Sequence, residues 1–216
     1  LGIADVALGS DTGGSVRIPA ALNGLCGFKP SQSAVPLDGA FPLSQSYDSI
    51  GPLARTIAQC SAVHAVLSAS AQSPQSRENL RVGVAGGVLT EGLDTQVAAD
   101  VQRAIEILAA AGFALTDIDL PMLEGFGNVN RVIVASEAHR VHAGRLARME
   151  TEGDPHVLRR IRAAEGFAPH DESDARAQRA SAIAAFSAQA EKYDVFIAPT
   201  LPPVVPLIAD VETDFD

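Results

Sequence analysis

A glycine-rich loop near the start of the chain holds the residues best suited to chemistry. It reads Gly9-Ser10-Asp11-Thr12-Gly13-Gly14-Ser15. Small residues let the backbone turn sharply and point successive N–H groups at one place, where they can hold a phosphate or a developing oxyanion. Ser15 directly follows two glycines and would lie beside these N–H groups, an arrangement that suits a serine nucleophile. The amides of Thr12, Gly13 and Gly14 would then stabilise its tetrahedral intermediate.

Taken alone, this loop is also compatible with a simple turn between two elements. The sequence has no GxxxxGK[ST] phosphate loop, no GxGxxG dinucleotide motif and no GxSxG nucleophile elbow. The loop therefore predicts a backbone anion site, without assigning it to one of these three classes.

The elements around the loop would position it between a strand and a helix. Residues 1–10 predict a buried strand that leads into the loop, and Pro19 suits the first position of a short helix through Leu22. The many Pro and Gly residues of 31–52 predict mostly loop, and residues 55–67 have apolar positions at helical spacing.

The rest of the chain predicts an α/β fold. Residues 81–85 and 115–120 read as strands with a helix between them, which implies parallel pairing with a crossover. Three helices are expected at about 129–149, 155–164 and 173–192, followed by a short buried strand at 195–199 and a Pro-rich loop.

Composition excludes several classes of protein. The chain has 216 residues, of which 47% are hydrophobic and 19% charged, so it is neither disordered nor, with two cysteines, a disulfide-stapled scaffold. A net charge of −10 argues against nucleic acid as a partner. The longest uncharged window, 56–76, is too polar for a membrane span, and two free thiols suit the cytoplasm.

Three sequence blocks, in order, resemble the amidase signature family. The first runs from Ala7 to Ala20 and continues through Gly24-Leu25-Cys26-Gly27-Phe28-Lys29-Pro30. The second comprises Phe41-Pro42-Leu43-Ser44 and the segment from Tyr47 to Arg55. The third, Tyr193 to Thr200, is similar to a later buried strand of the family. Residues 1–69 carry most of the resemblance.

The resemblance implies an amidase that hydrolyses a small carboxamide through a serine acyl-enzyme, with no metal and no organic cofactor. Ser15 would be the nucleophile, and the amides of Thr12, Gly13, Gly14 and Ser15 itself would form the oxyanion hole. Asp11 would anchor the loop as a hydrogen-bond acceptor, and Arg17 would orient it. Asp48 and Arg55 would fix a turn at Gly51-Pro52. A homodimer is compatible with this assignment.

The implied fold is a mixed β-sheet core flanked by helices, of which this chain would hold only part. Within a single amidase domain spanning 1–216, we expect a signature core with the nucleophile loop (1–69), a linker (70–80), a strand–helix–strand unit (81–128), a helical substrate-side region (129–192), and a core strand with a Pro-rich loop (193–216).

The family activates its serine with a cis-serine and a lysine that precede the nucleophile loop, and neither is found in this sequence. Lys29 belongs to a block that is structural in the family, and Lys192 lies on a predicted helix far along the chain. We therefore expect the chain to be an internal portion of a longer protein, poorly stable and inactive by itself.

Two other functions stay open. One is the amidase subunit of a tRNA-dependent amidotransferase, although that subunit has Gln where this chain has Ile18. The other is a non-catalytic module that binds an anion or small ligand, because the triad lysine and cis-serine are missing. His139 and His142, near Glu137, have a spacing that metal ligands can adopt, but a partly exposed helix face explains them as well, and we expect no metal.

Overall fold

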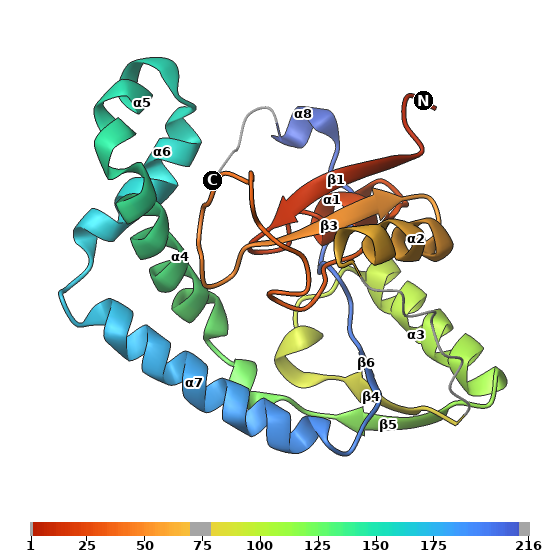
Figure 1. Ribbon diagram of the computed structural model, residues 1–216. Coiled ribbons are helices and arrows are strands. Elements are labelled where there is room, and N and C mark those ends of the chain that lie inside the picture. Colours follow the sequence, from red (N-terminus) through yellow and green to blue (C-terminus); the bar gives the residue numbers. More distant parts are fainter. Residues whose placement is uncertain (1, 70–78, 212–216) are drawn as a thin grey trace. The chain divides into compact units, whose positions relative to one another are not determined.

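A computed structural model describes residues 2–69 and 79–211 (Figure 1). The chain divides into two compact units, each assembled from two separate segments. Unit 1 comprises Leu1–Gln72 and Asn128–Arg176, and unit 2 comprises Ser73–Gly127 and Ala177–Asp216. Most of the predicted linker, residues 70–78, lies outside the described residues, and the predicted division of the chain stays a prediction.

Unit 1 contains a small antiparallel sheet in the order β1-β3-β2. Its strands are β1 (Val6–Asp11), β3 (Ser49–Ala54) and the two-residue β2 (Cys26–Gly27). Gly9 pairs with Gly51 in the register of β1 and β3. Two helices accompany the sheet, α1 (Arg17–Leu22) and α2 (Ile57–Leu67). Thr56 and Gln59 form a capping box at the start of α2, which explains why this helix begins after Arg55.

The prediction that residues 31–52 are mostly loop was wrong at its end. Gly51 and Pro52 lie inside β3, the central strand, so there is no turn there for Asp48 and Arg55 to fix. Gly51 is required because a Cβ at this position would overlap the carbonyl oxygen of Phe28. Proline lacks an N–H, but the carbonyl of Pro52 still accepts a hydrogen bond from the Phe28 amide at 3.0 Å.

The first strand is where the sequence predicted it, but it is not buried among the described residues. It forms one edge of the three-stranded sheet, and Leu8 is 57% exposed. Only its last residue, Asp11, is fully buried. The strand therefore leads directly into Asp11 and the loop after it.

The helical part of the chain is more finely divided than the periodicity predicted. It consists of α4 (Phe126–His142), α5 (Leu146–Glu152), α6 (Pro155–Arg162) and α7 (Asp171–Ala190), with 3₁₀ turns at Ala143–Arg145 and Ala163–Gly166. The expected helix over 129–149 is broken by the 3₁₀ turn around Gly144, where glycine disfavours continued helix. Asp154 caps α6 by accepting from the amides of His156 and Val157.

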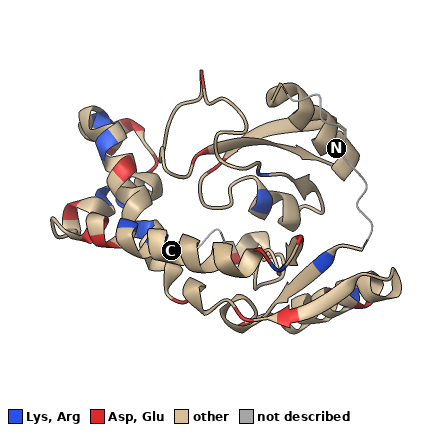
Figure 2. Ribbon diagram, turned by 60° about the horizontal axis from the view of Figure 1, so that its bottom comes forward, with Lys and Arg blue, Asp and Glu red and all other residues tan. Residues whose placement is uncertain are grey.

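Arginines on these helices lie beside acidic residues (Figure 2). The ion pairs include Arg140–Glu172, Arg162–Glu150 and Arg148–Glu152. Such pairing of opposite charges is typical of a solvent-exposed helical face.

Unit 2 contains a parallel sheet in the order β5-β4-β6. Its strands are β4 (Arg81–Ala85), β5 (Ala114–Ile118) and β6 (Val195–Ile197), and helix α3 (Thr95–Ala110) connects the first two. The predicted parallel pairing with a crossover helix is confirmed. Short 3₁₀ turns at Gly87–Leu89 and Pro121–Leu123 and helix α8 (Ile208–Val211) complete the unit.

The core of unit 2 forms around Ala85, Ile118 and Leu120, against which Phe186 and Phe196 pack. Helices combined with small sheets confirm the predicted α/β class. Within the described ranges, no helix is both long enough and apolar enough to cross a membrane.

Candidate active site

The loop of Asp11 to Arg17 connects the end of β1 to the start of α1, as the sequence predicted. Ser15 is exposed at this turn, whereas Gly14 and Val16 on either side of it are buried. Gly14 has φ +121°, and a Cβ there would lie 2.5 Å from Cδ1 of Ile18. Only glycine satisfies both conditions, so Gly14 lets the backbone turn tightly and present Ser15 to solvent.

Asp11 organises this loop through its fully buried carboxylate. It accepts hydrogen bonds from the Gly14 amide at 2.8 Å, the Val16 amide at 3.2 Å and the Arg17 amide at 3.4 Å. The Arg17 guanidinium donates two more, from Nε and Nη2, both at 3.0 Å. Burial alone would raise the pKa of Asp11, but the Arg17 side chain and these amides outweigh burial and lower it.

The same carboxylate explains where α1 begins. The helix starts at Arg17, two residues before the predicted start at Pro19. Asp11 takes up the amides of Val16 and Arg17, which have no partner within the helix, and so acts as a cap from outside it. Pro19 is tolerated because it still lies in the first turn, where N–H groups lack helical acceptors.

The hydrogen bonds also limit which amides can receive an anion. The Gly14 amide is occupied by Asp11. Among the described residues, the amides of Thr12, Gly13 and Ser15 have no such acceptor. These three N–H groups belong to the exposed Ser15 and to two residues within three positions of it, and such a segment suits the oxyanion of an acyl-transfer intermediate.

The neighbouring strand fixes the start of the loop. The Thr12 hydroxyl donates to Asp48 Oδ1 at 2.5 Å, and the Ser49 hydroxyl donates to the carbonyl of Asp11 at 3.0 Å. Asp48 immediately precedes β3 and Ser49 is its first residue, and β3 pairs with β1. Asp48, expected to fix a turn at Gly51-Pro52, instead contacts Thr12 of the glycine-rich loop.

The two lysines of the sequence lie in different units. Lys29 donates from Nζ to the carbonyl of Pro30 at 2.8 Å. Burial lowers its pKa, and the nearby charge of Arg17 lowers it further. Lys192 follows α7 in unit 2 and is exposed.

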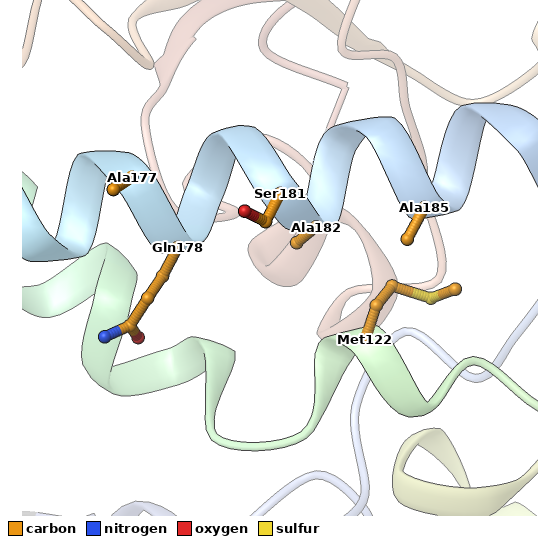
Figure 3. Close-up of a pocket in the computed structure, with 6 residues that line it drawn as sticks. All are labelled: Met122, Ala177, Gln178, Ser181, Ala182 and Ala185. Atoms are coloured by element: carbon orange, nitrogen blue, oxygen red, sulfur yellow. The ribbon is translucent and has the colours of Figure 1, made fainter.

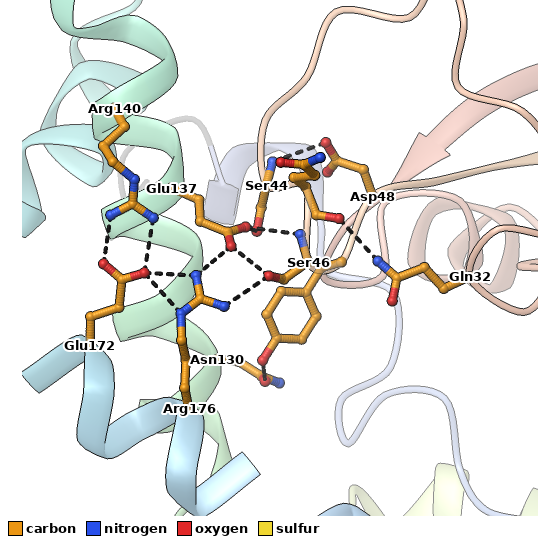
Figure 4. Close-up of polar contacts among 11 residues, drawn as sticks. Gln32, Ser44, Ser46, Asp48, Asn130, Glu137, Arg140, Glu172 and Arg176 are labelled. Atoms are coloured by element: carbon orange, nitrogen blue, oxygen red, sulfur yellow. Dashed lines mark hydrogen bonds and ion pairs between the residues drawn. The ribbon is translucent and has the colours of Figure 1, made fainter. Parts of the chain in front are cut away.

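Sequence reasoning missed a buried polar cluster in unit 1 (Figure 4). Glu137 of α4 is only 8% exposed and accepts hydrogen bonds from Ser44, Ser46 and Arg176. The sequence singled out Glu137 only as a neighbour of two histidines. A carboxylate in the middle of an otherwise apolar stretch of α4 was the available signal, but the two serines lie more than ninety residues earlier in the chain.

The two histidines near Glu137 do not form a metal site with it. His139 Nε2 lies 3.5 Å from Glu165 Oε1, and the His142 ring packs on Phe41 with centroids 5.5 Å apart. Across residues 2–69 and 79–211, no three His, Cys, Asp or Glu side chains are grouped as metal ligands.

Unit 2 carries a shallow pocket of about 480 Å³ on α7 (Figure 3). Small side chains of α7 form one wall and Met122 the other. Ser181 and Gln178 are its polar groups. The pocket can accommodate an apolar group, but it belongs to unit 2 and the nucleophile loop belongs to unit 1.

Comparison with known proteins identifies the family. The Amidase family matches residues 1–214. A 2-amino-5-chloromuconic acid deaminase from Comamonas testosteroni is 32% identical over 98% of this chain and 47% of its own length. A glutamyl-tRNA(Gln) amidotransferase subunit from Synechococcus sp. (strain RCC307) is 36% identical over 63% of this chain and 32% of its own length.

A solved structure agrees with these relatives. A crystal structure of an amidase has a TM-score of 0.88 and 32% identity, covering 94% of this chain and 46% of that one. The chain thus spans about half the length of the first relative and of this structure. With a family match over nearly every residue and a shared fold, the chain is a member of the amidase signature family.

Proposed function

We propose that the protein hydrolyses a small carboxamide, with Ser15 as the nucleophile. The main support is the geometry of the loop, in which a buried carboxylate, Asp11, holds the backbone so that Ser15 stays exposed. Ser15 Oγ would attack the amide carbonyl, and the leaving amine would depart to give an acyl-enzyme. Water would then release the acid.

The amides of Thr12, Gly13 and Ser15 would hold the oxyanion of the intermediate. Removing one donor from such a hole typically costs about 2.7–4 kcal/mol of barrier height. Gly14 has a different part in this proposal than the sequence suggested, because its N–H already donates to Asp11. Its contribution is the positive φ that lets the loop turn. By the family resemblance, a lysine acting through a cis-serine would take the proton from Ser15 Oγ and return it to the leaving amine.

The amidotransferase subunit is a second candidate because several relatives carry that name. The Synechococcus relative is 36% identical, but it matches only 63% of this chain, whereas the deaminase relative matches 98%. Ile18, whose side chain lies against Gly14, replaces the Gln expected of that subunit. These observations favour a hydrolase that acts on a small molecule. Copurification of partner subunits with the full-length protein would favour the amidotransferase.

The proposal is tested by labelling the full-length enzyme with a fluorophosphonate and measuring ammonia release from a panel of small carboxamides. We expect Ser15→Ala to abolish labelling and to reduce ammonia release by at least about 10³-fold, because the acyl-enzyme cannot form. Ser10→Ala is the matched control, since Ser10 is an exposed serine that the structure places in β1, before the segment from Asp11 to Arg17. Labelling that persists in Ser15→Ala would show that another residue is the nucleophile.

A further inference from the structure

Glu137 is a buried carboxylate, and most of its hydrogen-bond donors come from one turn of the chain, residues 43–48 (Figure 4). Its Oε2 accepts from the Ser44 hydroxyl at 2.6 Å and from the Ser46 amide at 3.0 Å. Its Oε1 accepts from the Ser46 hydroxyl at 2.5 Å and from Arg176 Nη2 at 2.6 Å. Three of these four donors come from residues 44–46, so Glu137 determines where this turn lies.

The other side of the same turn holds the nucleophile loop. Asp48 Oδ2 accepts from the amides of Leu43 and Ser44 at 2.8 and 2.9 Å, and its Oδ1 accepts from the Thr12 hydroxyl at 2.5 Å. Ser44 is shared, because its hydroxyl contacts Glu137 and its amide contacts Asp48. All of these residues lie in unit 1.

We propose that Glu137 is a positioning residue for the nucleophile loop, acting through the turn at 43–48 and through Asp48 on Thr12. The inference rests on the proposed function, because it assigns a catalytic effect to the geometry of Thr12 to Ser15. Thr12 supplies one of the proposed oxyanion amides, so a displaced turn would misalign that amide with the carbonyl under attack. Misplacement by about 1 Å can lower a rate by as much as 10²-fold.

Helix α4 holds the turn at a second residue. The Tyr47 hydroxyl donates to Asn130 Oδ1 at 2.7 Å. Asn130 lies seven residues before Glu137, two helical turns away on the same face of α4. Two contacts from one rigid helix fix the position and the orientation of the turn, whereas one contact would fix only its position.

The outer part of the cluster provides a matched control. Glu172 accepts from Arg176 at 2.7 Å and from Arg140 at 2.6 and 2.9 Å. It therefore shares Arg176 with Glu137, while its own partners are the arginines of α4 and α7 rather than residues of the turn at 43–48. A change at Glu172 perturbs the same ion-pair cluster but keeps the three donors of residues 44–46 on Glu137, and it reaches the turn only through Arg176, whose Nη1 donates to the Ser46 hydroxyl at 3.0 Å.

The test measures kcat and KM of the full-length enzyme. The concentration of active sites, by which kcat is calculated, is titrated with a fluorophosphonate. We expect Glu137→Gln to lower kcat by about tenfold or more with KM changed less than about twofold. Glu137→Asp is expected to recover part of the loss because it keeps the charge. Glu172→Gln should lower kcat by less than about twofold, because Ser44 and Ser46 still contact Glu137. An unchanged kcat per titrated site in Glu137→Gln, or an equal loss in Glu172→Gln, would overturn the inference.

A double-mutant cycle tests the route. Thr12→Val removes the hydroxyl that contacts Asp48 and keeps the backbone amide. If Glu137 acts through this contact, the double variant loses about as much kcat as the more impaired single variant, whereas additive losses would overturn the route.

Should Glu137→Gln fail to fold, Ser44→Ala replaces it. This substitution removes one donor to Glu137 and keeps the hydrogen bond from the amide of residue 44 to Asp48. A wild-type enzyme without label at Ser15 would instead overturn the proposed function, and the inference with it.

Discussion

Two buried carboxylates carry much of the organisation at the scale of single residues. Asp11 and Glu137 each take donors from an irregular segment and from an arginine on a helix, and in both the hydrogen bonds outweigh the cost of burial. A buried charge is stable only when it is paired and hydrogen-bonded, which both residues achieve. Asp11 forms the loop, and Glu137 places the turn beside it.

Glu137 predicts a pH dependence of stability. Burial tends to raise its pKa, but hydrogen bonds from Ser44, Ser46 and Arg176 lower it from 4.5 to about 2. A lowered pKa in the folded state means that the stabilisation is fully present above pH 4.5 and is lost as the pH falls toward 2. The difference between these two pKa values corresponds to about 3 kcal/mol of folding stability at neutral pH.

The measurement is urea unfolding of the full-length protein between pH 3 and pH 7. We expect Glu137→Gln to be less stable than the wild type by about 3 kcal/mol near pH 7, with the difference shrinking steadily below pH 4.5. Glu124→Gln, at an exposed carboxylate, is the control and should change stability by less than about 0.5 kcal/mol. A difference that does not depend on pH would contradict this assignment of the pKa.

At the scale of elements, the close approach of β3 to the segment after β2 depends on one glycine. A side chain at Gly51 would overlap the carbonyl oxygen of Phe28, which is backbone and cannot rotate away. We expect Gly51→Ala to force β3 away from the segment after β2 and to destabilise the protein by at least about 2 kcal/mol in urea unfolding. Because β3 carries Ser49 and follows Asp48, amide hydrolysis should fall as well.

A second glycine provides the comparison for this change. Gly144 lies in the 3₁₀ turn after α4, and a Cβ there meets nothing within 4 Å. Gly144→Ala is expected to keep or slightly raise stability, by up to about 1 kcal/mol, because alanine favours helix. Equal destabilisation by the two substitutions would show that the close approach of Phe28 is not the cause.

The elements that sequence predicted well are those that local patterns determine. The strand–helix–strand unit of β4, α3 and β5 follows from apolar periodicity and from the rule that parallel strands need a crossover, and both hold in the structure. Strand β3 was missed because Gly51 and Pro52 are turn residues by type, and only the neighbouring backbone explains the glycine.

Long-range contacts set the limit of prediction at the candidate site. The nucleophile loop is contiguous in sequence, so its residue types sufficed to predict a serine among backbone amides. Glu137 is separated from Ser44 by 93 residues, and no local pattern links them. Glu137 could be found only once the fold had brought α4 to the turn.

At the scale of the whole molecule, each of the two units contains ion pairs of its own. Glu137 and Arg176 stabilise unit 1. In unit 2, Asp194 accepts from the amide, Nε and Nη2 of Arg81 and so ties β6 to β4. If the units open independently, each substitution should affect only the unit that contains it.

Hydrogen exchange measured by mass spectrometry on the full-length protein tests this independence. We expect Glu137→Gln to speed exchange in peptides of 43–48 and the adjoining part of α4, while β4 and β5 keep their protection. Asp194→Asn should do the reverse, loosening β4 and β6 because the carboxylate that holds Arg81 is weakened. Faster exchange in both units from either substitution would show that they open together. In that case the kcat of Glu137→Gln would be compared with that of Glu172→Gln. Glu172 shares Arg176 with Glu137, so this comparison separates a loss of kcat from a global loss of stability.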